Sequence, residues 1–224
     1  MTVFPLVEPE TATGVTEGLL AKAHRVLGLT PNVVKAIANS PAALRGYLEL
    51  SRALRDSSLP PATRSRVALL AAERNGCDYC LSMHTYTGTR TDGLTPEAAA
   101  LARAGAAEDP KDAAALAFAD ALIRSRGAVA DAELAAAAAE LSSGELVEVI
   151  AHVALNIFGA YVALAGRLEI DWPLVEHGGA RPLGRSSVQV ADQAAQVEEM
   201  SQGEQDGDDQ DGQKYLAHEG APQT

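Results

Sequence analysis

The spacing of apolar residues along positions 1–176 restricts the fold of this chain more than any other feature. Apolar side chains recur every three or four residues, and no alternating pattern typical of a strand is sustained. Proline, glycine, serine and threonine stand between the segments, where they suit the beginnings and ends of helices. The segments are rich in alanine, which has the highest helix propensity. The pattern predicts an all-α helical domain over residues 1–176.

The positions of these breaks predict nine helices. They cover residues 15–27, 31–38, 41–56, 62–75, 78–89, 96–104, 110–125, 131–141 and 145–168. Aromatic residues make up only 4% of the chain, so each helix has few bulky side chains to bury. Because alanine covers little apolar area, we expect the surface to be completed by a neighbouring subunit in a homo-oligomer.

The composition changes at residues 177–224. This stretch has nine acidic and three basic residues and supplies half of the net charge of −12. Its apolar residues are too few and scattered to offset the entropy of ordering the chain. We therefore predict a disordered acidic tail. A solvated extension is the favoured interpretation, and recruitment of a partner protein is the alternative.

Charge and hydropathy exclude several classes of function. The 30 acidic residues outnumber the 18 basic ones, so most of the surface repels phosphate backbones and nucleic acid binding is not expected. No run of 18 or more apolar residues occurs, so no membrane helix is expected. The first residues lack the pattern of a signal peptide. The expected location is the cytoplasm, where thiols are kept reduced.

Both cysteines of the chain, Cys77 and Cys80, lie in one short segment with His84. The preceding Asn-Gly is a helix stop, so a new helix is expected to begin at residue 77 or 78. Unpaired backbone N–H groups and the positive end of the helix dipole favour a thiolate there. His84 lies one turn after Cys80 on the same face. As an imidazolium it would lower the thiol pKa, and as a neutral imidazole it would accept the proton.

Two sulfurs one helical turn apart can form and break a disulfide with little backbone movement, which favours reversible two-electron chemistry. A zinc site is the main chemical alternative, because Cys77, Cys80 and His84 offer three ligands. One helix face rarely supplies all three, and no second Cys/His pair follows at finger spacing. Redox chemistry is therefore favoured, with no metal and no organic cofactor.

The segment Glu-Arg-Asn-Gly-Cys-Asp-Tyr-Cys-Leu-Ser-Met-His-Thr at residues 73–85 resembles the active-site segment of AhpD-like alkylhydroperoxidases, within the carboxymuconolactone decarboxylase superfamily. Residues 29–33 and 40–44 resemble the upstream part of that family. Residues 145–173 resemble its closing helix and exit turn. The resemblance covers about residues 25–175 and leaves the acidic tail outside.

The resemblance implies an all-helical fold that assembles as a homotrimer or a trimer of dimers. It implies that Cys80 attacks a hydroperoxide, that Cys77 resolves the sulfenic acid, and that an external dithiol reduces the resulting disulfide. His84 matches the histidine of the proton relay. Tyr79 stands between the cysteines, where some members have histidine.

One position departs from the family pattern. A glutamate usually lies twelve residues before the first cysteine, as the terminal base of the relay, and here that residue is Ser65. Serine does not serve as a general base near neutral pH unaided. Glu73, four residues before Cys77, is the proposed substitute. The alternative for Glu73 is a solvated residue in the last turn of its helix.

Glu148, His152 and Asn156 share one face of the last helix. This face lines a pocket or a subunit contact near the thiols or, as the favoured interpretation, is the solvated side of the helix. His177 shows no partner pattern and is predicted to lie on the surface.

The main hypothesis is a thiol peroxidase or dithiol–disulfide oxidoreductase, and two alternative functions accompany it. One is carboxymuconolactone decarboxylase-type lactone chemistry on the same fold. The other is a non-enzymatic redox sensor whose acidic tail recruits a partner.

Overall fold

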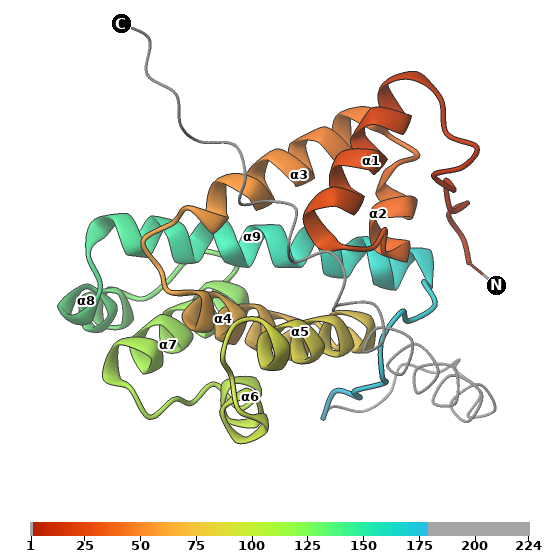
Figure 1. The fold of residues 1–224 in the computed structure, drawn as a ribbon. Helices are drawn as coiled ribbons and strands as arrows, with labels where there is room; N and C mark the ends of the chain where they lie inside the picture. The colour runs from red at the N-terminus through yellow and green to blue at the C-terminus, as the bar shows by residue number, and fades with distance from the viewer. Residues whose placement is uncertain (1, 179–224) are drawn as a thin grey trace, which may run out of the picture. The chain divides into compact units, whose positions relative to one another are not determined.

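A 24-residue helix, α9 (Ser143–Gly166), runs between two groups of helices (Figure 1). The computed structural model describes residues 2–178, which all lie within one unit, Met1–Arg181. The predicted tail lies almost wholly outside the described residues.

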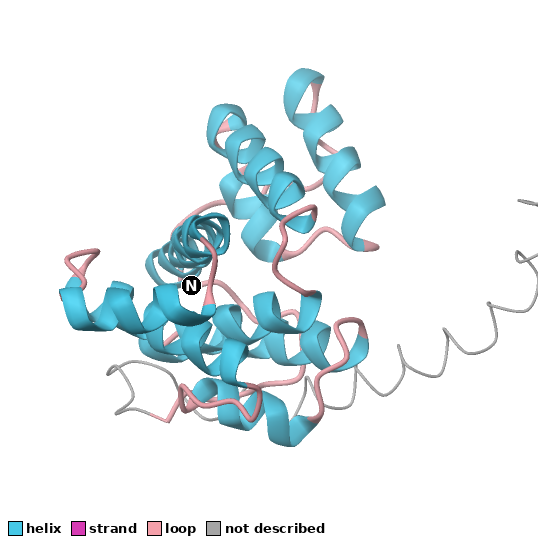
Figure 2. Ribbon diagram, turned by 90° about the vertical axis from the view of Figure 1, so that its left-hand side faces the viewer, coloured by secondary structure: helices cyan, strands magenta, loops and turns pink. Residues whose placement is uncertain are grey.

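Eight further helices lie within the described residues. They are α1 (Gly14–Leu27), α2 (Asn32–Ile37), α3 (Pro41–Arg55), α4 (Pro61–Arg74), α5 (Asp78–Arg90), α6 (Pro96–Arg103), α7 (Pro110–Ser125) and α8 (Asp131–Glu140). Every predicted helix is found, with each end within two residues of the predicted one. Residues 2–178 contain no strand, so the prediction of an all-α domain is confirmed for this part of the chain (Figure 2).

The helices form two layers on either side of α9. The first layer is α1 with α2 and α3, and the second consists of α4 to α8, with α4 packed against α5, α6, α7 and α9. Helix α4 is the most buried of them, since its side chains from Val67 to Ala72 are almost without exposure. It carries the chain directly to the cysteine pair, so the site begins at the best-packed element of the domain.

The start of α9 is fixed by a capping box. The Ser142 side chain accepts a hydrogen bond from the Glu145 backbone N–H, and the Glu145 carboxylate accepts one from the Ser142 N–H. The Lys111 ammonium lies 2.6 Å from that carboxylate. These contacts satisfy N–H groups that would otherwise lack partners, and they set where α9 begins.

One face of α9 is apolar and exposed. Val147 is 65% exposed, Ile150 44%, Phe158 39% and Tyr161 60%. By length and composition alone α9 could cross a membrane, a feature that the search for long apolar runs did not identify. A helix at the centre of a packed domain meets the same criteria, so this is weak evidence for a membrane.

Candidate active site

The break between α4 and α5 places both cysteines. Gly76 has a φ of +61°, a left-handed conformation that glycine adopts at little cost. Its N–H bonds to the Glu73 carbonyl at 3.0 Å, and the Cys77 N–H bonds to the Ala72 carbonyl at 3.0 Å. This arrangement ends α4 and turns the chain at once into α5, as the Asn-Gly pair predicts.

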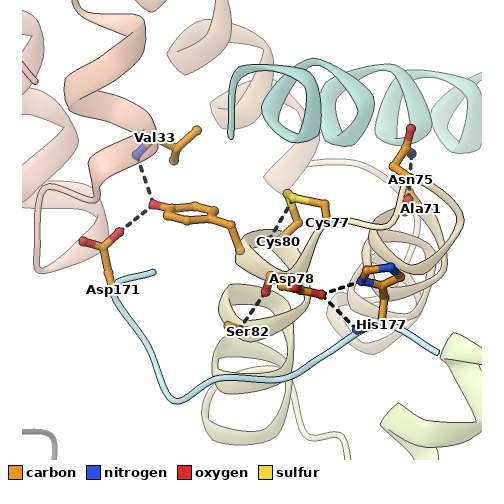
Figure 3. Close-up of a disulfide and its surroundings, with 10 residues drawn as sticks. Val33, Ala71, Asn75, Cys77, Asp78, Cys80, Ser82, Asp171 and His177 are labelled. Carbon is orange, nitrogen blue, oxygen red and sulfur yellow. Dashed lines mark hydrogen bonds and ion pairs between the residues drawn. A yellow bond between two sulfur atoms is a disulfide. The ribbon is translucent and has the colours of Figure 1, made fainter. Parts of the chain in front are cut away.

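Cys77 is the N-cap residue of α5, and its sulfur accepts a hydrogen bond from the Cys80 backbone N–H at 3.2 Å. The two residues form a disulfide, with their Cα atoms 5.3 Å apart (Figure 3). Both are buried, with 0% exposure for Cys77 and 4% for Cys80. The expected location of the pair at a helix start is therefore confirmed.

His84 lies one turn beyond Cys80 and is half-buried. Burial lowers the pKa of His84 to about 4, and the Asn156 side chain and the Asp92 charge offset only part of this effect. The imidazole is therefore neutral near pH 7. Of the two roles predicted from the sequence, acceptance of a thiol proton fits this state, and stabilisation of a thiolate by a resident positive charge does not.

Cys80 and His84 line the same small cavity. Its volume is about 10 Å³, close to the least that holds one water molecule. Tyr79, Met83 and Asn156 contribute further walls. The structure thus brings the second cysteine and the predicted proton carrier to one enclosed space.

A larger pocket of about 530 Å³ lies between the first layer of helices and the α4, α5 and α9 helices. The two cavities share the lining residues Val33, Tyr47, Met83, His84, Leu155 and Asn156. A volume of this size is typical of pockets that bind small molecules. The larger pocket thus adjoins the small cavity that Cys80 lines.

Ser65, at the position where the family usually has glutamate, lies on the wall of the larger pocket. Its hydroxyl donates to the Asp92 carboxylate at 2.5 Å. Asp92 follows the C-cap of α5 and lines the same pocket as His84. The sequence analysis missed this carboxylate, although its position eight residues after His84, about two helical turns, was a usable signal.

Glu73 is engaged elsewhere. Its carboxylate lies 2.8 Å from the Arg103 guanidinium and accepts a hydrogen bond from the Gly178 N–H at 2.5 Å. These contacts join the end of α4 to α6 and to the segment after α9. They do not lead toward His84, so the structure gives no support to Glu73 as the base of a relay.

Tyr79 holds the start of α5 against two other parts of the chain. Its hydroxyl donates to the Asp171 carboxylate at 2.6 Å and accepts from the Val33 N–H at 3.0 Å (Figure 3). Its ring packs edge-on against Trp172, with centroids 5.5 Å apart. Burial and the neighbouring carboxylate raise the pKa of Tyr79 far above its ordinary value, so the phenol remains protonated.

The segment after α9 lies along α5. Ser82 accepts a hydrogen bond from the Val175 N–H at 2.9 Å. His177 Nδ1 lies 2.6 Å from the Asp78 carboxylate (Figure 3). The His177 side chain is only 8% exposed. The prediction of a surface position for His177 was wrong, because the sequence shows no sign of a partner 99 residues away.

The polar face of α9 contains one buried residue, His152, between the half-buried Glu148 and Asn156. His152 is 7% exposed and lines the larger pocket with Asn156, while Glu148 accepts hydrogen bonds from the Ser58 N–H and hydroxyl. The favoured interpretation of a solvated face was therefore wrong for His152, and the pocket alternative holds for His152 and Asn156 but not for Glu148, which does not line the pocket. Burial, followed by the Arg64 charge, lowers the pKa of His152 to about 4.

Among residues 2–178 there is no group of three or more His, Cys, Asp or Glu side chains that could hold an ion.

The lowered pKa values of His84 and His152 predict a loss of stability in acid. In the unfolded chain both imidazoles take up a proton near pH 6.5, whereas in the folded protein they do so near pH 4. Between pH 4 and pH 6.5 the unfolded state therefore binds more protons than the folded state. The free energy of unfolding falls as the pH drops from 6.5 toward 4. Denaturant titrations over this range measure the decline, which should be shallower in His84→Gln. An unchanged slope in this variant would contradict the assignment.

Residues 41–124 match the model of the carboxymuconolactone decarboxylase family. The match begins at the start of α3, ends in α7 and includes both cysteines and His84. Comparison with curated proteins gives no match.

Several solved structures share the fold. A protein from Ralstonia eutropha JMP134, described as an alkylhydroperoxidase AhpD core and an uncharacterized peroxidase-related protein, is 19% identical with a TM-score of 0.67, over 76% of this chain and 92% of its own. The debrominase Bmp8 without ligand is 20% identical with a TM-score of 0.66, over 76% and 93%. Its cysteine-to-alanine variant in complex with 2,3,4-tribromopyrrole is 20% identical with a TM-score of 0.65, over 76% and 94%.

Both cysteines and His84 lie within the matched residues 41–124, and the solved structures have a similar helical fold. Residues 41–124 are therefore similar to the carboxymuconolactone decarboxylase family, and the helical fold is similar to that of the AhpD-core and debrominase structures over 76% of the chain.

Proposed function

We propose that the protein is a thiol-dependent peroxidase that reduces hydroperoxides through Cys77, Cys80 and His84. The observation that carries this proposal is the cavity that Cys80 shares with His84, beside a disulfide to Cys77. A dithiol that closes within one helical turn can donate two electrons and store the oxidised product without a large rearrangement.

Cys80 is the attacking thiol in this proposal. It lines the cavity with His84, whereas Cys77 has no exposed surface and is the N-cap of α5. The Cys80 thiolate attacks the terminal oxygen of ROOH, the O–O bond breaks, and sulfenic acid and alkoxide form. The Cys77 thiol then attacks the sulfenic sulfur, so the disulfide forms and water leaves. An external dithiol reduces the disulfide and restores both thiols.

His84 moves the proton in both directions. As a neutral imidazole it accepts the Cys80 proton before the attack, and it then donates that proton to the leaving alkoxide. The transient imidazolium is stabilised by the charge of Asp92, which already opposes the effect of burial on the pKa of His84. We therefore propose Asp92, hydrogen-bonded to Ser65, in place of the glutamate that the family usually carries and in place of Glu73.

Self-association is part of the proposal. The exposed apolar side chains of α9 follow helical spacing, and no charged residue occurs from position 149 to 166. An uncharged stripe of this length is typical of an interface between subunits. A homotrimer or a trimer of dimers, located in the reducing cytoplasm, suits an enzyme that an external dithiol must regenerate.

Two other reactions remain alternatives on this fold. A dithiol could also remove bromide from a brominated ring, since C–Br can be converted to C–H with two electrons from the thiols, and debrominase Bmp8 shares the fold. Lactone decarboxylation, which the family name suggests, would consume no thiols. A redox sensor would form the disulfide without catalytic turnover. Thiol titration during multiple turnovers with each substrate separates these cases.

Replacement of the attacking thiol tests the proposed cycle. In Cys80→Ser we expect hydroperoxide consumption with excess dithiothreitol to fall to background, because serine is not ionised near pH 7. In Cys77→Ser without reductant we expect one equivalent of peroxide to be consumed and a sulfenic acid to remain on Cys80, detectable by dimedone labelling and mass spectrometry. Unchanged turnover in Cys80→Ser would refute the mechanism.

Two matched carboxylate-to-amide variants test the source of the supporting charge. Asp92→Asn should lower kcat/KM for hydroperoxide by about tenfold or more, because the imidazolium loses its countercharge. Glu73→Gln should affect thermal stability more than kcat/KM, since its partners are Arg103 and the chain end. The opposite ranking of kcat/KM would assign the role to Glu73 instead.

A further inference from the structure

The larger pocket is positively charged, although the whole chain carries a net charge of −12. Four cationic side chains line it, from three different helices: Lys22 of α1, Arg52 and Arg55 of α3, and Arg64 of α4. Asp92 is the one carboxylate in the lining, and it accepts hydrogen bonds from the hydroxyls of Ser65 and Thr91. An excess of positive charge on a concave wall attracts anions.

Arg64 is half-buried, whereas Arg52 and Arg55 are exposed. Its Nη1 donates to the carbonyl oxygens of Leu54, at 2.9 Å, and of Arg55, at the C-terminal end of α3. No carboxylate pairs with it among residues 2–178. The side chain is therefore fixed in position while its charge is not neutralised by an ion pair. A guanidinium held in this way is suited to bind a carboxylate with two parallel hydrogen bonds.

Arg52 and Arg55 also have a simpler role. They lie in the last turn of α3, where positive charge complements the helix dipole. That role requires no pocket, however, and both side chains line one together with Lys22 from another helix. The Arg55 charge also acts on Tyr47, a residue common to both cavities. The cations are thus arranged around the space that leads to the thiols.

Most of the remaining lining is apolar and includes Val26, Leu27, Val34, Leu48, Leu54 and Leu155. A ligand that satisfies both parts of the wall has an anionic group and an apolar body. The larger pocket adjoins the cavity of Cys80 through shared residues such as His84 and Met83. A molecule anchored at Arg64 can therefore direct its other end toward the site of reaction.

We infer that this pocket selects organic hydroperoxides that carry a carboxylate, with the carboxylate bound by Arg64 and the apolar body lying toward His84 and Cys80. The inference rests on the proposed peroxidase function for its reaction and on the pocket alone for its binding. Lys22, Arg52 and Arg55 attract the anion to the mouth of the pocket, and Arg64 fixes its orientation.

The kinetic test compares cumene hydroperoxide with its para-carboxylate, using the full-length protein and dithiothreitol as the reductant. The wild-type protein should show a kcat/KM at least about tenfold higher for the carboxylate. In Arg64→Gln most of this preference should be lost through a higher KM, with the value for the neutral substrate changed less than about twofold. Added salt should lower kcat/KM for the carboxylate alone.

Matched variants separate pocket charge from overall charge. Arg52→Gln and Lys22→Gln should each weaken the preference, whereas Arg45→Gln should not, because Arg45 is exposed on the same helix as Arg52 but does not line the pocket. If Arg64→Gln unfolds, the first two variants still decide the question. Equal kcat/KM for the two substrates, or an equal effect of Arg45→Gln, would overturn the inference.

A binding experiment distinguishes failure of the inference from failure of the proposed function. The probe is 4-isopropylbenzoate, which resembles the carboxylated substrate but has no peroxide group, and isothermal titration calorimetry measures its affinity. Binding that is lost in Arg64→Gln, without turnover of any hydroperoxide, would support the pocket and reject the peroxidase proposal. No binding by the wild-type protein would reject the pocket assignment, whatever the enzyme does with neutral peroxides.

Discussion

The hydrogen bond from the Cys80 N–H to the Cys77 sulfur is the interaction on which the site depends. It exists because α4 stops at a glycine with positive φ and α5 starts at once, with Cys77 as its N-cap. The N-cap residue of a helix is usually serine, threonine, aspartate or asparagine, whose side-chain oxygen accepts a backbone hydrogen bond. Here the Cys77 sulfur accepts that bond. The same turn of helix brings the second sulfur within bonding distance of the first.

The rest of the domain holds this junction in place. Tyr79 ties the start of α5 to α2 and to Asp171, and His177 ties Asp78 to the segment after α9. Both cysteines are buried, and the larger pocket shares lining residues with the cavity beside Cys80.

The helices could be predicted because proline, glycine and capping residues mark their ends. The motif of Cys77, Cys80 and His84 could be predicted because its residues are close in sequence. The contacts of Asp92, His177 and Glu73 could not be predicted in this way. Each depends on how helices pack across long sequence separations, as with His177 and Asp78. The charge state of His84 was also open, since burial decides it and the sequence does not report burial at single positions.

The central claim is that a hydroperoxide reaches the buried pair and oxidises it directly. A single-turnover experiment on the fully reduced wild-type protein tests this claim, with thiol counting and peptide mass mapping after one equivalent of hydroperoxide. The account predicts the loss of two thiols per chain and a Cys77–Cys80 disulfide formed with one equivalent of alcohol. Retention of both thiols while the peroxide persists would contradict it.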